Sequence, residues 1–251
     1  MNLIDFLLNL LLGVSLGTLG GLFGIGGGLL AIPALGVLFG LDQQLAQGTA
    51  LVMVVPNVLL ALWRYHQRNR IDLRHALTLA ASSFLCALLG ARWAVTLDAE
   101  RMRLAFVAFL VALACYNLSR VYWRPAAGSS ELRQPWPWLA LLGSGAGLLG
   151  GLLGVGGAVL ATPVLTGLFG TTQVMAQGLS LALAAPSTGV TLITYALHGH
   201  VDWALALPLA LGGLLSISWG VRFAHALPER LLRALFAGFL LLCALLLGLR
   251  V

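Results

Sequence analysis

Long apolar stretches follow one another along the chain, separated by short segments that hold most of its charged residues. In the first half they cover roughly residues 3–23, 27–40, 45–64, 74–96 and 103–122. Most of them are close to the ~20 residues that a helix needs to cross about 30 Å of hydrocarbon. They lack the alternation of apolar and polar residues over about ten positions that is typical of a membrane β-barrel. The pattern therefore predicts an all-α polytopic membrane protein.

The sequence contains an internal repeat. The segment GGLFGIGGGLLAIPAL, which begins at Gly20, matches GGLLGVGGAVLATPVL, which begins at Gly150, an offset of 130 residues. The same offset, without a gap, pairs Gly40 with Gly170, Ala46-Gln47-Gly48 with Ala176-Gln177-Gly178, Pro56 with Pro186, Tyr65 with Tyr195, Asp72 with Asp202, Gly90 with Gly220 and Arg92 with Arg222. A register kept over this length predicts two copies of one unit, each with about five helical segments.

We assign residues 1–122 to the first copy and 137–251 to the second. Residues 123–136 join them, and their Pro, Gly, Ser and charged residues are typical of a linker. The second segment of each copy, at 27–40 and 157–170, is short. A helix of about 14 residues spans only about 21 Å, so each either crosses the bilayer with strong mismatch or returns as a re-entrant hairpin.

Arginine placement predicts that the two copies are inverted. Short cytoplasmic loops collect Arg and Lys. After the third segment, the first copy has WRYHQRNRIDLR, whereas the second has TYALHGHVDWA with no arginine. The first loop is therefore expected inside and the second outside, so each copy makes an odd number of crossings, five or three. Inverted repeats are typical of secondary transporters, whose substrate site lies near the midplane at the repeat interface.

Composition excludes several classes of protein. The chain is 60% hydrophobic and 9% charged, with a mean hydropathy of +0.97, whereas soluble domains carry roughly 25% charged residues. Every basic residue is Arg, and most lie near the ends of apolar stretches, so we interpret the net charge of +6 as topological and expect no nucleic-acid partner. Its three cysteines lie singly in apolar stretches, and we expect no disulfide, metal or cofactor. The first segment lacks a basic start, and we interpret it as a mature helix.

Two glycine-rich breaks interrupt apolar segments at the same place in both copies, and each is followed by a proline. Unwound backbone at membrane depth must be packed in protein or line a wet cavity, and N–H groups at a half-helix start favour an anion. The binding candidates are Gly24, Gly26, Gly27, Gly154, Gly156 and Gly157. The alternative is that such glycines only allow close helix packing. That alternative fits best for Gly13, Gly17, Gly21, Gly143, Gly147 and Gly151.

A second group of candidates is neutral and polar and lies along the third segment of each copy. The group comprises Gln47, Gly48, Thr49, Asn57, Gln177, Gly178, Ser180, Ser187 and Thr188. The polar side chains can donate hydrogen bonds to a small oxyanion without adding charge. Two alternatives stay open, namely hydrogen bonds between helices and a cation held by carbonyls freed at Pro56 and Pro186.

Carboxylates lie at segment ends or in loops, so no carboxylate proton relay is expected in mid-membrane. The coupling ion, H⁺ or Na⁺, stays open.

Arg92 and Arg222 near the end of each fourth segment either complement the helix dipole or form an electropositive vestibule. Ser144 with His198 or His200 could form an intramembrane pair, but no acid would orient the histidine. The chain also has no P-loop, and we expect no enzyme.

The paired GGxxGxGG(G)xxxxPxL motifs, each followed by Gln-Gly and small polar residues, resemble the TauE/SafE family of sulfite and organosulfonate exporters. The resemblance covers essentially the whole chain. It implies a two-repeat, multi-pass permease of the bacterial inner membrane that exports small sulfur-containing anions such as sulfite or sulfoacetate. The family's AxGTS-like stretch is matched by residues 46–50, where Ala50 replaces the serine, and 176–180, where Leu179 replaces the threonine. The two copies have therefore specialised.

The leading hypothesis is a secondary transporter, most simply an exporter, that alternates access by rocking one repeat against the other. Its expected partners are a small anionic substrate, the lipid bilayer and a coupling ion. A passive anion channel and a non-transporting membrane assembly partner are the alternatives. The substrate, the direction and the oligomeric state stay open at this point.

Overall fold

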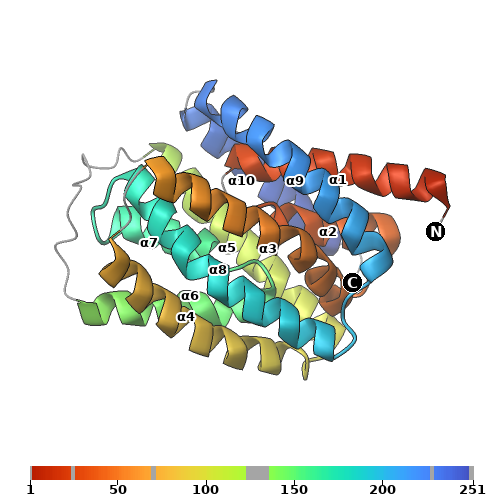
Figure 1. Ribbon diagram of the computed structural model, residues 1–251, viewed down its shortest axis with the longest axis horizontal. Coiled ribbons are helices and arrows are strands. Elements are labelled where there is room, and N and C mark those ends of the chain that lie inside the picture. Colours follow the sequence, from red (N-terminus) through yellow and green to blue (C-terminus); the bar gives the residue numbers. More distant parts are fainter. Residues whose placement is uncertain (1, 24–25, 69–71, 123–135, 227–228, 249–251) are drawn as a thin grey trace. The chain divides into compact units, whose positions relative to one another are not determined.

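The computed structural model describes residues 2–23, 26–68, 72–122, 136–226 and 229–248 (Figure 1). Over these ranges the chain forms ten α-helices. They are α1 Leu3–Phe23, α2 Gly28–Phe39, α3 Gln43–Arg68, α4 Leu73–Ala94, α5 Ala99–Tyr122, α6 Trp136–Leu153, α7 Ala158–Gly167, α8 Gln173–Leu197, α9 Trp203–Ala226 and α10 Glu229–Gly248. The predicted all-α fold is confirmed.

Five of the helices in the described ranges are long and apolar enough to cross a membrane, by length and composition. These spans are Leu3–Phe23, Gln43–Arg64, Leu73–Ala94, Met175–Leu197 and Trp203–Gly220. Apolar side chains are exposed along them, for example Leu11, Leu85 and Leu215, each at least 60% accessible. Such exposure is costly in water and is expected where lipid covers the surface. The chain is therefore a multi-pass membrane protein.

Two compact units divide the chain, and each combines helices from both halves of the sequence. Unit 1 comprises residues 1–53, 97–124 and 200–251, and unit 2 comprises 54–96 and 125–199. Unit 1 thus contains α1, α2, the start of α3, α5, α9 and α10, whereas unit 2 contains the rest of α3, α4, α6, α7 and α8. The sequence copies 1–122 and 137–251, and their inverted orientation, remain predictions from the repeat register and the arginines.

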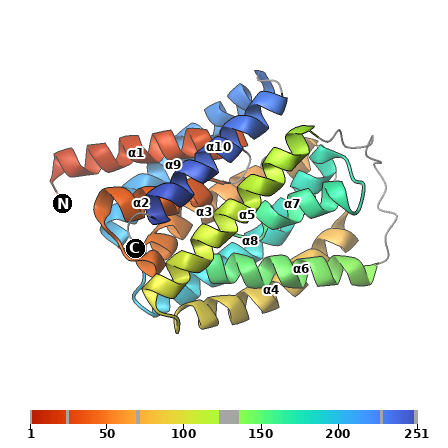
Figure 2. The same cartoon turned by 180° about the vertical axis from the view of Figure 1, so that it is seen from behind.

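In unit 1, α1 and α9 lie side by side (Figures 1 and 2). Their backbones touch at glycines. A Cβ added at Gly13 would overlap the backbone of Leu209, one at Gly17 would overlap Gly213, and one at Gly220 would overlap Thr18. Because residue numbers rise together in both helices, the two are parallel.

Unit 2 contains the equivalent pair, α6 and α4, in the same register. A Cβ at Gly143 would crowd Leu79, one at Gly147 would overlap Ser83, and one at Gly90 would overlap Leu148. Adding the 130-residue offset to the α1 residues and subtracting it from the α9 residues turns the α1–α9 contacts of unit 1 into these contacts. In both units, therefore, the first helix of one copy packs against the fourth helix of the other copy. The prediction that the spaced glycines allow close packing is confirmed for Gly13, Gly17, Gly143, Gly147 and Gly151.

The short second segments form helices of 12 residues in α2 and 10 residues in α7. At 1.5 Å per residue they are about 18 and 15 Å long, roughly half of the hydrocarbon thickness. Each folds back tightly on the helix before it. A Cβ at Gly20 would overlap Gly27, and one at Gly150 would crowd Gly157. Of the two interpretations left open by the sequence, these lengths and contacts favour re-entrant hairpins over full crossings.

Three further contacts hold unit 1 together. Helices α5 and α10 lie side by side (Figure 2). The rings of Phe23 and Phe236 are 4.9 Å apart between centroids, which joins the end of α1 to α10. At the start of α3, Gln44 Nε2 donates a hydrogen bond to the Leu97 carbonyl, with a length of 2.7 Å. The beginnings of α3 and α5 therefore lie at the same end of unit 1.

The contact between α6 and α4 predicts a sharp difference between two glycines of α6. Replacing Gly147 with Ala places a Cβ into the Ser83 backbone, and overpacking of this kind costs about 1–3 kcal/mol. The same change at Gly145, where a Cβ meets nothing within 4 Å, should be neutral or slightly stabilising because Ala favours helices. Thermal unfolding in detergent should show a lower midpoint for G147A only. Equal midpoints for the two variants would contradict the packing scheme.

Candidate functional site

The glycine-rich breaks turn the chain from one helix of each hairpin into the next. Gly26 and Gly27 have φ values of 70° and 92°, and Gly154 and Gly156 have 67° and 70°. This left-handed region is open to glycine without the steric cost that a Cβ brings. The predicted helix breaks are therefore present in both hairpins. The remaining candidate of this group, Gly24, lies outside the described residues, as do linker residues 123–135.

The breaks leave the starts of α2 and α7 without side-chain caps. Gly27 and Gly157 occupy the N-cap positions, and neither helix start has a side-chain cap hydrogen bond. The N-cap carbonyls accept the N–H groups of Ala31 and Ala161, at 2.9 Å each. The first N–H groups of a helix have no acceptor within it, and the helix dipole makes this end partly positive. Both starts are thus suited to a small anion.

In unit 2 the break at the start of α7 lies against the middle of α8. A Cβ at Gly156 would come within 2.6 Å of Thr188 Cγ2, and one at Gly157 within 2.5 Å of Leu183 Cδ2. Ser187 and Thr188 are buried, and each hydroxyl donates to the Ala184 carbonyl, at 3.1 and 2.7 Å. The structure therefore brings together candidates from the glycine break and from the polar group.

Asn57 belongs to the same region of unit 2. It is fully buried in α3 between Val54 and Val58. Those two valines form an apolar cluster with Ala158, in the first turn of α7, and Ala184 of α8. The turn of α3 that carries Asn57 thus packs beside the start of α7. Polar residues of α3 and α8 therefore lie in the region of the α7 start.

The first half of α8 also contacts α7. The hydroxyls of Thr162 and Ser180 form a hydrogen bond of 2.9 Å. This bond fits the interhelical alternative for Ser180. Gly178 is buried and Gln177 half-buried in the same part of α8.

In unit 1 the corresponding candidates hold the segment before α9. The Thr49 hydroxyl accepts the N–H of Asp202 at 3.0 Å, and a Cβ at Gly48 would overlap the His200 carbonyl oxygen. Asp202 Oδ1 in turn caps α9 by accepting the N–H of Ala204 at 3.0 Å. Gly48 and Thr49 therefore have a structural explanation. Gln47, one residue earlier, is fully buried in α3.

Sequence reasoning did not single out Gln43, Gln44 and Thr162, which are among the polar residues that the structure buries or pairs. Gln43 and Gln44 are about 95% buried although they begin a helix. A usable signal was present, because Gln43 recurs as Gln173 at the repeat offset. Over the described ranges, no group of three or more His, Cys, Asp or Glu side chains could hold a metal ion.

Several known proteins are similar to this chain over most of its length. A protein of Xylella fastidiosa (strain Temecula1), named probable membrane transporter protein, is 30% identical over 223 residues, which are 86% of this chain and 82% of that protein. A probable membrane transporter protein of Methanocaldococcus jannaschii is 26% identical over 253 residues, with 92% and 91% covered. One of Bacillus subtilis is 24% identical over 230 residues, with 83% and 84% covered.

A family model gives the broader assignment. The model described as "Sulfite exporter TauE/SafE" matches residues 9–247. This range includes both re-entrant hairpins, both glycine breaks and both parallel helix pairs. The chain therefore belongs to the sulfite exporter TauE/SafE family.

Proposed function

We propose that this membrane transporter is a secondary exporter of small sulfur-containing anions, such as sulfite or sulfoacetate, in the bacterial inner membrane. Its family and its relatives, which are named probable membrane transporter proteins, support the transporter class. The family description supports sulfite as the substrate to test first.

One observation carries the choice of an anion: two short helices begin inside hairpins without side-chain caps, and neutral polar side chains lie near the start of α7. The start of α7 has Asn57, Ser187 and Thr188 in its region, and none of these side chains carries a charge. A helix start attracts negative charge through its dipole and its N–H groups. The carboxylates in the described ranges lie in loops or in the first turns of helices, such as Asp5, Asp72 and Glu100, so none stands in a helix middle to repel an anion.

The equivalence of the two units supports a mechanism of alternating access. Each is built on a parallel glycine-packed pair, α1–α9 or α6–α4, with a re-entrant hairpin attached. Helix α3 belongs to unit 1 up to Met53 and to unit 2 from Val54. Pro56 lies just after this boundary and removes the helical hydrogen bond to Val52. We infer that the units are the moving bodies and that α3 bends at this proline.

Transport itself is tested with purified protein in liposomes. Uptake of radiolabelled sulfite and sulfoacetate should saturate and should depend on one imposed gradient of H⁺, Na⁺ or voltage, because a carrier binds its substrate once per cycle. Flux that rises linearly with concentration and follows voltage alone would instead identify a passive anion channel. No flux with either anion, together with stoichiometric co-purification of an enzyme complex, would favour an assembly partner.

The site on α8 predicts a selective loss of affinity. Thr188→Val keeps the side-chain shape beside Gly156 but removes a hydroxyl, and a hydrogen bond to a charged group is worth about 1.5–3 kcal/mol. The apparent KM for the transported anion should therefore rise about tenfold or more. Thr194→Val is the control, because Thr194 is also buried in α8 and also donates to its own helix, at Val190. Equal KM values for the two variants would place the anion elsewhere.

The proposed bend in α3 predicts a loss of rate without loss of affinity. Pro56→Ala restores a helical hydrogen bond and stiffens α3, so the maximum rate should fall several-fold while KM changes little. The matched control is Pro208→Ala, because Pro208 interrupts α9, which lies entirely within unit 1. An unchanged rate for P56A, or the same loss in P208A, would remove α3 as the hinge.

A further inference from the structure

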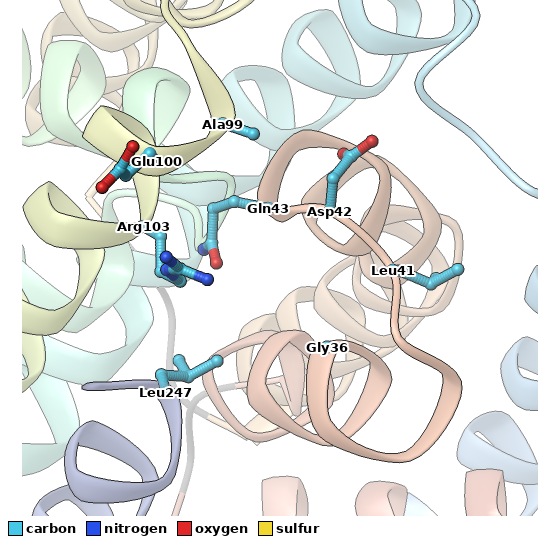
Figure 3. A pocket seen from close by; sticks show the side chains of 8 residues that line it. All are labelled: Gly36, Leu41, Asp42, Gln43, Ala99, Glu100, Arg103 and Leu247. Carbon is cyan, nitrogen blue, oxygen red and sulfur yellow. The ribbon is translucent and has the colours of Figure 1, made fainter. Parts of the chain in front are cut away.

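Unit 1 contains a cavity of about 280 Å³ that the proposed transport site does not use. It lies where α3 and α5 begin and where α2 and α10 end. Gly36 of α2 and Leu247 of α10 form part of its wall, and Gln43 and Arg103 reach it from α3 and α5 (Figure 3). All four residues belong to unit 1.

Gln43 presents an unused donor to this cavity. Its side chain is 5% exposed, and its Nε2 atom has no hydrogen-bond partner in the part of the chain that the structure describes. Figure 3 shows the amide turned toward the guanidinium of Arg103 at the edge of the open space. A buried amide N–H is normally satisfied by an acceptor. The geometry therefore calls for a ligand that offers oxygen atoms.

The charges around the cavity restrict the ligand further. Arg103 is the cation of the lining, and Asp42 and Glu100 are its acids. Both acids point away from the open space in Figure 3, and Asp42 Oδ1 accepts the Leu45 N–H at 2.8 Å as the cap of α3. Two helix starts and two helix ends meet at the cavity, and their dipoles oppose one another. The charged side chains therefore determine which ligand charge the cavity favours. The three charged side chains sum to −1, so an anion is favoured only by the orientation of the acids away from the space, and one negative charge is repelled less than two.

The repeat supports a role for the donor pair. At the 130-residue offset, Gln173 stands in place of Gln43 and Arg233 in place of Arg103. The acids do not recur, since Thr172 replaces Asp42 and Arg230 replaces Glu100. Both copies keep the amide and the guanidinium, whereas the acids differ between them. Packing alone would not require this pair of polar residues.

We propose that Gln43 and Arg103 bind a singly charged oxyanion in this cavity, at a site separate from the starts of α2 and α7. The guanidinium supplies a planar fork of donors that fits sulfonate, carboxylate or phosphodiester oxygens, and Gln43 Nε2 supplies one more. The oxyanion comes either from a free small anion or from the headgroup of a lipid. This inference goes beyond the proposed transport and is tested by binding alone.

The experiment measures the unfolding midpoint of purified, delipidated protein in an uncharged detergent. The probes are methanesulfonate, sulfate and chloride at equal ionic strength, and a short-chain phosphatidylglycerol. Either methanesulfonate or the lipid should raise the midpoint, because a ligand that binds the folded state stabilises it, and sulfate should act more weakly. The probe that acts identifies the source of the oxyanion.

Matched variants assign the effect to the cavity. R103Q and Q43E should weaken the apparent affinity about tenfold, the usual scale for a charge-assisted hydrogen bond. R101Q is the control, because it removes the same charge two residues away. The Arg101 side chain is 76% exposed, and its Nε lies 3.4 Å from Asp98 Oδ2. In T188V, the part of the midpoint shift that depends on Arg103 should remain. This result would separate the cavity from the transport site. Equal shifts in R103Q and R101Q with every probe would overturn the proposal.

Discussion

Close contact between helix backbones is the constraint on which both units depend. The α1–α9 and α6–α4 pairs approach so closely that even a methyl group at Gly17 or Gly147 would overlap the partner backbone. In lipid there is little hydrophobic force between helices, so association depends on such packing. The re-entrant hairpins carry backbone that helices do not fully satisfy, and lipid cannot solvate it. The paired helices therefore provide the protein surroundings that make the hairpins possible.

These hairpins connect packing to function. The starts of α2 and α7 are buried, and a partly positive helix start that is shielded from water interacts strongly with an anion. At the start of α7, glycine conformation brings that end beside Thr188, and the packing of α3 brings Asn57 into the same region. An anion bound there would need no positively charged side chain. Because no permanently charged side chain is buried there, the empty site also costs little desolvation free energy.

Much of the fold could be predicted because the repeat register and the apolar lengths are strong signals. The sequence ranges agree with the helices to within a few residues, and the spaced glycines are packing residues as expected. It could not be predicted that the first helix of each copy packs against the fourth helix of the other copy. The glycines of α1 fit the small residues of α4 or α9 equally well by pattern, and the offset shows equivalence without showing which copy supplies the partner.

The candidate site was predicted only in part. The roles of Gly48 and Thr49 depend on the segment before α9, more than 150 residues away, which no local pattern reveals. Gln43 lies before the predicted third segment, at residues 45–64, yet it begins α3 and is buried. The most direct test of the account is a cryo-electron microscopy structure with sulfite bound. We expect the anion within hydrogen-bond distance of the first N–H groups of α2 or α7. An anion held by arginine side chains far from both helix starts would contradict it.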